Sequence, residues 1–270
     1  MTEQIYTYRD PSFNLNQAYY YTLLMQIDAV SFSYAITYNR QLIAWGTNCS
    51  LTELSDPQEL AEELSATYKK VVIGLPANGF SLLPSHLFNK AQIPNYARLL
   101  DVKPDERVLA QVLDDQNFII YKVDEKIISA VQRFDLDNTV YLNKGWITSV
   151  TKNSPQNQDL YLHTENGKAE FLYFKDGKIR LYNNFDFTTG DDLAYYAAFI
   201  TEELNLDAHD IHFKLSGNIK PGDKYSTRLA DFFPDIVFYD PQILELPEQI
   251  PSQQILTLAA LSLCGSLEVL

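Results

Sequence analysis

Residues 217–224 contain two glycines and end in a lysine, after a predicted strand, and these are the residue types of a phosphate-binding loop. In such a loop the lysine reaches the phosphates, and a Ser or Thr that follows it binds Mg²⁺. Here Lys224 comes one residue late, Tyr225 stands where the hydroxyl is needed, and Pro221 removes a backbone N–H group from the loop. This segment is therefore interpreted as a loop followed by the start of a helix.

His209 and His212 are three positions apart, a spacing that brings two imidazoles to one metal ion when the residues form a helix. Ile211, however, begins a predicted strand. The favoured interpretation is therefore polar residues at the start of a strand, and no metal site is expected.

Asp191 and Asp192 have carboxylates that could bind a cation, and they follow Thr189 at a predicted helix start. A threonine cap and acidic side chains in the first turn stabilise the free N–H groups of a helix. Helix capping is therefore favoured over cation binding.

No arrangement of residues predicts a nucleophilic enzyme. Ser85 lies beside His86, but no acid stands in an obvious place to orient the imidazole. Cys49 and Cys264 are far apart, and neither is in a C-x-x-C motif, so we expect reduced thiols and a cytoplasmic location.

The composition predicts a globular and acidic protein. Of the 270 residues, 46% are hydrophobic and 21% are charged, and 35 acidic residues against 21 Lys and Arg give a net charge of −14. Nucleic acids and anionic membranes bind clustered cations, so neither is an expected partner. The longest apolar run, residues 255–263, is shorter than the roughly 20 residues that span a bilayer. It is interpreted as a C-terminal helix.

Hydrophobic periodicity predicts the same order of elements in both halves of the chain, namely three strands, a helix and a strand. In the first half the strands are predicted at 23–28, 32–37 and 41–47, the helix from Asp56, and the last strand at 70–75. In the second half the strands are predicted at 159–163, 169–174 and 179–187, the helix at 191–204, and the next strand at 211–215. A helix at 224–233 and a strand at 235–239 follow.

This repeated order predicts an α/β protein built by duplication, because the element order repeats while few residues are identical. The first half is predicted at residues 1–152, with an insertion at about 91–122. The second half is predicted at residues 153–270 and includes the C-terminal helix. The polar residues 153–158 are the predicted linker.

Several segments resemble the actin-like ATPases, and in particular the members of type IV pilus assembly and type II secretion. The resemblance is carried by the hairpin Lys175-Asp176-Gly177-Lys178, by Thr189-Gly190-Asp191-Asp192-Leu193, and by the strand and glycine loop Lys214-Leu215-Ser216-Gly217-Asn218. The whole chain also resembles an uncharacterised bacterial family with this fold, through Met25-Gln26-Ile27-Asp28, Leu82-Leu83-Pro84 and Lys214-Leu215-Ser216-Gly217. The resemblance implies an α/β protein with the actin-like ATPase (ribonuclease H-like) fold, in which two duplicated βββαβ-type halves flank a central cleft.

The resemblance also implies where an ATPase site would lie, because each half of such an enzyme places an acid beside a glycine-rich turn. The acids bind Mg²⁺ or position the attacking water, and the glycines let backbone N–H groups approach the phosphates. By position, the candidate catalytic acids are Asp28 and Glu165. The candidate nucleotide-binding residues are Ser31, Gly167, Ser216, Gly217 and Asn218.

The chain departs from this pattern at the phosphate-binding positions. Val30 stands where a glycine is expected after Asp28, and a β-branched residue resists a positive φ. His163 or Thr164 stands at the second acid position, which makes Glu165 a displaced acid. Each lost charge-assisted hydrogen bond to a phosphate costs about 1.5–3 kcal/mol, so the loss of several weakens nucleotide affinity by orders of magnitude.

The sequence therefore predicts a non-catalytic protein-interaction or scaffold module with a degenerate actin-like ATPase fold, no cofactor and a protein partner of unknown identity. The alternative is a nucleotide-binding protein, or a weak Mg²⁺-dependent ATPase or phosphotransferase, that uses the cleft with Asp28 and Glu165. ATP and Mg²⁺ would then be the cofactors. A homodimer stays open, because actin-like relatives often assemble.

Overall fold

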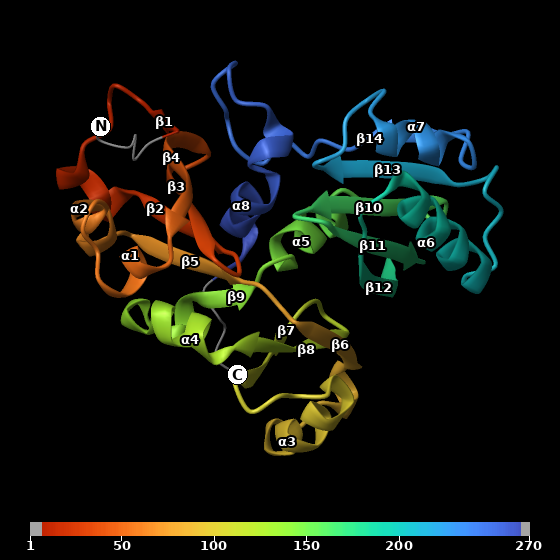
Figure 1. The fold of residues 1–270 in the computed structure, drawn as a ribbon, viewed down its shortest axis with the longest axis horizontal. Coiled ribbons are helices and arrows are strands. Elements are labelled where there is room, and N and C mark those ends of the chain that lie inside the picture. Colours follow the sequence, from red (N-terminus) through yellow and green to blue (C-terminus); the bar gives the residue numbers. More distant parts are fainter. Residues whose placement is uncertain (1–6, 266–270) are drawn as a thin grey trace. The chain divides into compact units, whose positions relative to one another are not determined.

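The computed structural model describes residues 7–265, and the chain divides into two compact units. Unit 1 contains the described residues up to Thr148, Ile243–Gln249, and the described residues from Thr257 onward. Unit 2 contains Ser149–Gln242 and Ile250–Leu256. Each unit has its own central β-sheet and its own buried side chains (Figure 1).

The main sheet of unit 1 has six strands in the order β1-β4-β3-β2-β5-β9. The strands are β1 (Tyr8–Arg9), β2 (Thr22–Ile27), β3 (Ser31–Tyr38), β4 (Gln41–Ser50), β5 (Lys70–Leu75) and β9 (Thr139–Tyr141). Neighbours among β1 to β4 are antiparallel, whereas β5 is parallel to both β2 and β9. Parallel strands covered on both faces carry continuous apolar runs, and Val72, Ile73 and Leu75 of β5 are buried accordingly. The strands predicted in the first half are confirmed.

Unit 1 also contains short helices, which lie between these strands or after the last of them. They are η1 (Leu15–Tyr20), α1 (Thr52–Ser55), α2 (Ala61–Ser65), α4 (Glu125–Val131), η5 (Gln132–Phe134), η6 (Leu136–Asn138), α5 (Lys144–Lys152), α8 (Leu256–Ala260) and η8 (Leu261–Leu263). The predicted helix start at Asp56 is wrong, because Asp56 ends α1 and its N–H donates to the carbonyl of Thr52 at 2.8 Å. The Glu53 carboxylate accepts the N–H groups of Gln58 and Leu60, which holds a loop between α1 and α2.

The C-terminal segment was predicted to belong to the second half. In the structure η8 and most of α8 belong to unit 1. Leu261 packs over Gly74 of β5, and the Lys70 ammonium donates to the carbonyl of Cys264. The boundary between the units falls within α5, just before the predicted linker at 153–158.

The chain between β5 and β9 forms a second sheet in unit 1, with three strands in the order β6-β8-β7. Its elements are β6 (Gly79–Pro84), η2 (Ser85–Leu87), η3 (Lys90–Gln92), α3 (Ile93–Tyr96), η4 (Ala97–Leu100), β7 (Glu106–Val112) and β8 (Asn117–Asp124). Phe88 stacks on Phe118 of β8, with the ring centroids 3.7 Å apart. This insertion is larger than the predicted segment 91–122, because β6 and the end of β8 lie outside that segment.

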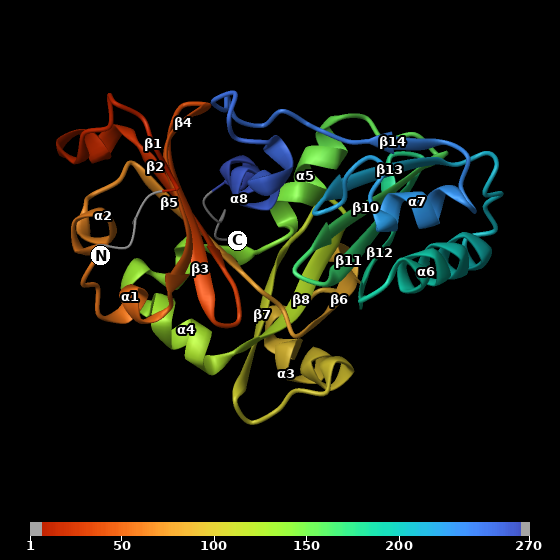
Figure 2. The ribbon, with the colours of Figure 1, turned by 45° about the horizontal axis from the view of Figure 1, so that its top comes forward.

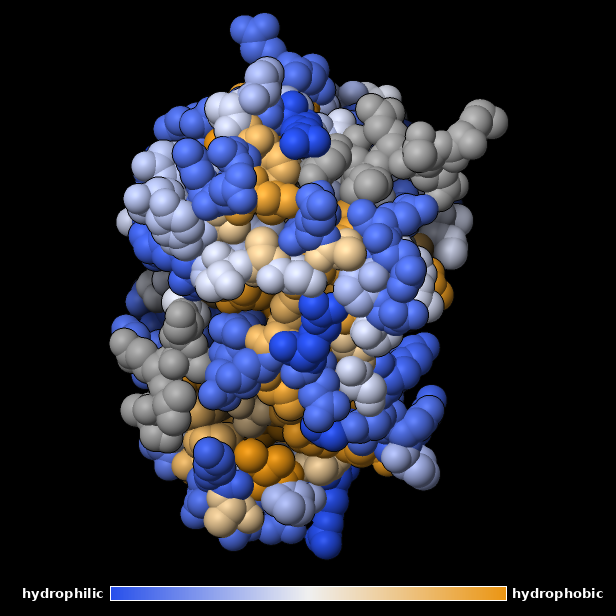
Figure 3. Space-filling model, turned by 90° about the vertical axis from the view of Figure 1, so that its left-hand side faces the viewer, coloured by the Kyte–Doolittle hydropathy of each residue, from blue (hydrophilic) through white to orange (hydrophobic). Residues whose placement is uncertain are grey.

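Unit 1 exposes several large apolar side chains, of which Val30 at 80% and Leu99 at 68% are the most exposed. Figure 3 shows the side of the molecule with the N-terminal elements, where apolar side chains lie mainly along the middle of the face and hydrophilic ones flank them. Isolated apolar side chains are ordinary on a protein surface, so exposure alone marks no site here.

The sheet of unit 2 has five strands in the order β12-β11-β10-β13-β14. The strands are β10 (Asp159–Glu165), β11 (Lys168–Lys175), β12 (Lys178–Asp186), β13 (His212–Gly217) and β14 (Ile236–Phe238). β10, β11 and β12 are antiparallel neighbours, and β13 is parallel to β10 and β14. Helices α6 (Gly190–Glu203) and α7 (Lys224–Ala230) lie along this sheet and bury Leu193, Ala197 and Leu229 in its core (Figure 2); η7 (Ser252–Gln254) follows β14.

Both units therefore contain three strands, helical structure and a parallel strand in the predicted βββαβ order. The Asp-Gly signal is confirmed, since Asp176 and Gly177 have φ of 53° and 72°, as a two-residue hairpin turn requires. Asn39 has a φ of 53° in the corresponding turn of unit 1. Within residues 7–265, no helix has the length and the apolar composition that crossing a membrane requires.

Candidate functional site

Asp28, the first candidate acid, directly follows β2 in unit 1. Its N–H donates to the carbonyl of Ser31 at 2.9 Å, which closes a tight turn with Ala29 and Val30 between them. Neither Ala29 nor Val30 has a positive φ, and the Val30 side chain points into solvent. Ser31 begins β3 and pairs with Ser50 of β4. This turn is a compact hairpin connection without the glycine conformations on which phosphate-binding turns depend.

Glu165 and Gly167 lie at the matching turn of unit 2, between β10 and β11. Asn166 and Gly167 have φ of 49° and 76°, the pattern of a type I′ hairpin turn. A Cβ added to Gly167 would meet the carbonyl oxygen of Phe187 at 3.7 Å, an ordinary contact. The turn conformation by itself therefore explains Gly167.

Ser216 and Gly217 end β13, and Asn218 follows them. Gly217 has a φ of +83°, and an added Cβ would overlap the carbonyl oxygen of Thr164 and come within 2.9 Å of the His163 ring. The N–H of Asn218 donates to the same Thr164 carbonyl at 2.7 Å. The close approach that requires a glycine at this position is thus an approach to β10 of the same unit.

His163 stands at the place of an expected acid and is buried on β10, at 1% exposure. Its Nδ1 lies 3.1 Å from the Ser216 Oγ, and its Nε2 lies 3.9 Å from Oε2 of Glu165. A serine, a histidine and an acid in series have the composition of a nucleophilic site, but a nucleophilic serine must reach its substrate. Ser216 is 2% exposed, so this series is a packed polar contact between β10 and β13.

Glu170 of β11 lies opposite His163 in the ladder and is itself buried. The Tyr182 hydroxyl donates to Oε2 at 2.7 Å, and Nδ2 of Asn184 donates to Oε1 at 3.1 Å. Burial raises the pKa of Glu170, although both hydrogen bonds oppose that shift. Glu170 was not among the residues predicted from the sequence, and the signal that could have found it is an acid inside the otherwise apolar strand at 169–174.

The N-termini of α6 and α7 are further places where backbone N–H groups can bind a phosphate. In α7, Oδ1 of Asp223 accepts the N–H of Tyr225 at 2.9 Å and the next N–H at 2.7 Å. In α6, Oδ2 of Asp192 accepts the N–H groups of Thr188 and Thr189. The predicted loop and the predicted helix capping are confirmed. At α7 a carboxylate of the chain occupies two N–H groups that an anion would need, and at α6 the Thr189 hydroxyl accepts the N–H of Asp192.

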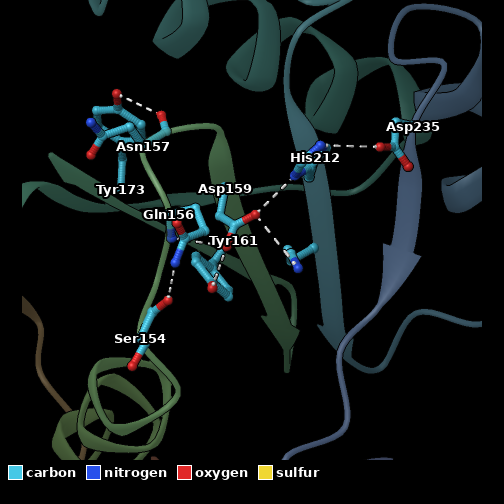
Figure 4. Close-up of polar contacts among 9 residues, drawn as sticks. Ser154, Gln156, Asn157, Asp159, Tyr161, Tyr173, His212 and Asp235 are labelled. Carbon is cyan, nitrogen blue, oxygen red and sulfur yellow. Dashed lines mark hydrogen bonds and ion pairs between the residues drawn. The ribbon is translucent and has the colours of Figure 1, made fainter. Parts of the chain in front are cut away.

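Asp159 at the other end of β10 is a buried carboxylate with donors on both oxygens (Figure 4). Its Oδ2 accepts the Gln156 N–H and the Tyr161 hydroxyl, each at 3.1 Å. Its Oδ1 lies 3.2 Å from Nδ1 of His212 and 3.5 Å from the Lys214 ammonium. These contacts join the loop before β10 to β13.

His212, one of the two histidines weighed as metal ligands, has a carboxylate near each ring nitrogen. Its Nε2 lies 3.7 Å from Asp235, which follows α7, in addition to the contact with Asp159. His212 is the first residue of β13, which confirms its place at the start of a strand. Within residues 7–265, no group of three or more His, Cys, Asp or Glu side chains could hold a metal ion.

The structure brings five of the seven candidate residues together at one end of β10, β11 and β13. These are Glu165, Gly167, Ser216, Gly217 and Asn218. Asp28 and Ser31 share the turn between β2 and β3 in unit 1. The roles of Asp28 and Glu165 as catalytic acids stay predictions.

Comparison with solved structures defines the class of protein. A Bacteroides thetaiotaomicron protein, described as having an actin-like ATPase fold and unknown function, matches with a TM-score of 0.78 at 18% identity, over 94% of this chain and 99% of that chain. The PilM–PilN type IV pilus biogenesis complex contains a chain that matches with a TM-score of 0.54 at 11% identity, over 90% of this chain and 96% of that chain. The chain therefore has the actin-like ATPase fold, as the resemblance implied.

The family follows from the sequence itself. Residues 10–236 match the model of the family described as Protein of unknown function (DUF3822), and the chain belongs to that family. A search of the curated proteins gives no match.

Proposed function

We propose that this chain is a protein-binding module that retains the actin-like ATPase fold without ATP turnover. The observation that carries the proposal is that the chain's own groups occupy the loops a nucleotide would need. Gly217 packs against Thr164 and His163, and Asp223 takes the N–H groups at the start of α7. The turn after Asp28 has Val30 in place of a glycine.

A neighbour with the same fold supports a protein as the partner. That neighbour belongs to a complex of PilM with PilN, in type IV pilus biogenesis. The chain also exposes aromatic side chains suited to interfaces, among them Tyr195 at 66% and Tyr19 at 55%.

Thermal and urea unfolding in a titration of Mg²⁺-ATP tests the absence of a nucleotide site. A ligand that binds the folded state alone adds about 2.7 kcal/mol to the free energy of unfolding at 100 times its Kd. We expect no saturable increase up to millimolar ATP. Asp28→Asn tests the candidate acid, and Asp176→Asn, at a hairpin turn far along the sequence, is the matched control.

Cross-linking followed by affinity capture, with reconstitution from purified components, tests the protein-binding role. We expect a partner whose affinity does not change with Mg²⁺-ATP or with Asp28→Asn. A saturable stabilisation by Mg²⁺-ATP, together with turnover that Asp28→Asn removes and Asp176→Asn retains, would replace this proposal with the ATPase or phosphotransferase alternative.

A further inference from the structure

β7 is an outer strand of the three-stranded sheet in unit 1, and no strand within residues 7–265 lies on its outer side (Figure 2). Its ladder with β8 runs from Glu106 to Val112 without a register shift. A straight edge strand presents unpaired backbone N–H and C=O groups, which are a template for another extended chain.

The hydrogen bonds at the two ends of the ladder fix which residues face β8. The N–H of Glu125 donates to the carbonyl of Asp105 at 2.8 Å, and the N–H of Leu113 donates to the carbonyl of Asn117 at 2.9 Å. Hydrogen-bonded positions recur at every second residue of an antiparallel strand. The odd-numbered positions from 105 to 113 therefore direct their backbone groups toward β8.

The even-numbered positions direct their backbone groups outward. The N–H of Glu106 is used within the chain, since it donates to the carbonyl of Lys103 at 3.1 Å. The outward positions that follow are Val108, Ala110 and Val112, whose side chains are partly exposed. Three consecutive outward positions offer a regular series of donors and acceptors to one extended segment.

Other outer strands of the chain carry features that oppose pairing. β1, β9 and β14 have 2, 3 and 3 residues. β6 ends in Pro84, and β12 has a register shift against β11 at Tyr173/Phe174. In β12 the side chain of Asn183 also accepts the N–H of Asn184. Between Val108 and Val112, β7 has no proline, lysine or register shift.

Charges at the ends of β7 select the kind of segment that fits. Asp105 precedes the strand and Asp115 follows it, and both are exposed. If two copies of β7 paired in antiparallel fashion about Ala110, Asp105 of each copy would face Asp115 of the other, and like charges opposite each other destabilise a strand pair. The flanking acids therefore disfavour a second copy and favour a segment with basic residues at both ends.

We propose that β7 binds its protein partner by strand addition. The partner supplies an extended segment with an apolar centre and Lys or Arg at both ends, which pairs with Val108, Ala110 and Val112. This inference rests on the proposed function, for which it supplies the binding surface.

Fluorescence anisotropy with a labelled peptide tests the proposal. The probe has a Val-Thr-Val-Thr-Val centre and two lysines at each end, and the comparison peptide has glutamates in place of the lysines. We expect saturable binding of the lysine peptide that weakens with added salt. Asp105→Lys combined with Asp115→Lys should reverse the preference in favour of the glutamate peptide.

Ala110→Pro removes an outward N–H and leaves the bonds to β8 in place, so it should lower the affinity by at least about tenfold. Ala110→Val keeps the N–H and is the matched control. Hydrogen exchange gives a readout independent of folding defects in the variants. In the wild-type chain, the peptide should slow exchange at Val108, Ala110 and Val112, while Leu109 and Gln111 are already slow.

Several outcomes would overturn the proposal. They are no saturable binding of the lysine peptide, unchanged exchange at the three amides, or a dimer that Ala110→Pro dissociates. An affinity that rises when residues 266–270 are removed would identify those residues as the occupant instead. If a partner captured by the full chain binds Ala110→Pro and wild type equally, the edge is excluded while the protein-binding function stands.

Discussion

Nδ1 of His163 lies 3.1 Å from the Oγ of Ser216, and this contact joins the parallel strands β10 and β13 directly beside Gly217. The two residues are opposite each other in the ladder, and both are buried. By the resemblance, an acid for Mg²⁺ or water belongs at or next to His163. This buried contact joins the two strands, and neither side chain of the pair is a carboxylate that could bind a metal ion.

Gly217→Ala should destabilise the chain by at least about 2 kcal/mol. A left-handed backbone conformation costs an L-residue about 1–2 kcal/mol, and overpacking of a filled site adds about 1–3 kcal/mol. The added methyl group would overlap the Thr164 carbonyl oxygen. Urea unfolding monitored by circular dichroism measures the change.

Gly222→Ala is the matched control, because Gly222 has a φ of +75° and an added Cβ meets nothing within 4 Å. It should cost only the conformational part, about 1–2 kcal/mol. Equal losses in the two variants would mean that the contact of Gly217 with β10 carries no packing energy.

The raised pKa of Glu170 predicts that the folded chain loses stability as the pH rises. Burial raises the pKa of this carboxyl above its ordinary value of 4.5, against the opposing effects of Tyr182, Asn184, His163 and Lys168. The folded chain therefore binds the proton more tightly than the unfolded chain, and the free energy of unfolding falls as the pH rises above about 4.5. Each unit of raised pKa corresponds to about 1.4 kcal/mol.

Glu170→Gln removes this titration while it keeps the size of the side chain. The difference in unfolding free energy, variant minus wild type, should increase with pH from about 4.5 upward until the folded-state pKa is passed. Urea unfolding at a series of pH values measures it. Parallel curves for the two proteins would contradict a raised pKa.

Much of the fold could be predicted from the sequence because its signals are local. The continuous apolar run at 70–75 predicts β5 to the residue, and Asp176-Gly177 predicts its hairpin turn. The end of α1 at Asp56 could not be predicted in this way. The Glu53 carboxylate accepts the N–H groups of Gln58 and Leu60 beyond the end of α1, and these hydrogen bonds compete with continuation of the helix.

The positions of the candidate loops could be predicted from the sequence, whereas the contacts that their residues make could not. Position 217 needs a glycine because Thr164 of β10 lies against it. Thr164 is its partner in the ladder but is more than 50 positions away in the sequence. Glu170 similarly gains its partners Tyr182 and Asn184 through the register of β11 with β12. Strand register depends on pairing across the sheet, which a single sequence specifies weakly.

Asp159→Ala should cost about 2–4 kcal/mol of stability. The side chain is 5% exposed, and its removal leaves the Tyr161 hydroxyl, the Gln156 N–H and the Lys214 ammonium without their acceptor. Asp235→Ala is the control, because Asp235 also pairs with His212 but its side chain is 50% exposed. That exposed pair should contribute no more than about 1 kcal/mol. Similar unfolding midpoints for the two variants would contradict the role of burial at Asp159.

The lowered pKa of Asp192 predicts that the start of α6 contributes less to the free energy of unfolding in acid. The N–H groups of Thr188 and then Thr189 bind its carboxylate, with further bonds from the two hydroxyls, and they lower its pKa from 3.8 to about 2. A lowered folded-state pKa gives stability that is complete above the unfolded value of 3.8 and is lost as the pH falls toward about 2. Asp192→Asn should therefore be less stable than wild type at pH 6, and the difference in unfolding free energy between the two proteins should close progressively below pH 3.8.

Glu203→Gln, at the C-terminal end of the same helix, is the control. There a negative charge opposes the helix dipole, so neutralisation should leave stability at pH 6 unchanged or slightly higher. A constant gap between wild type and Asp192→Asn throughout the acid range would contradict this prediction. It would mean that the protonated Asp192 side chain caps the helix as well as its carboxylate does.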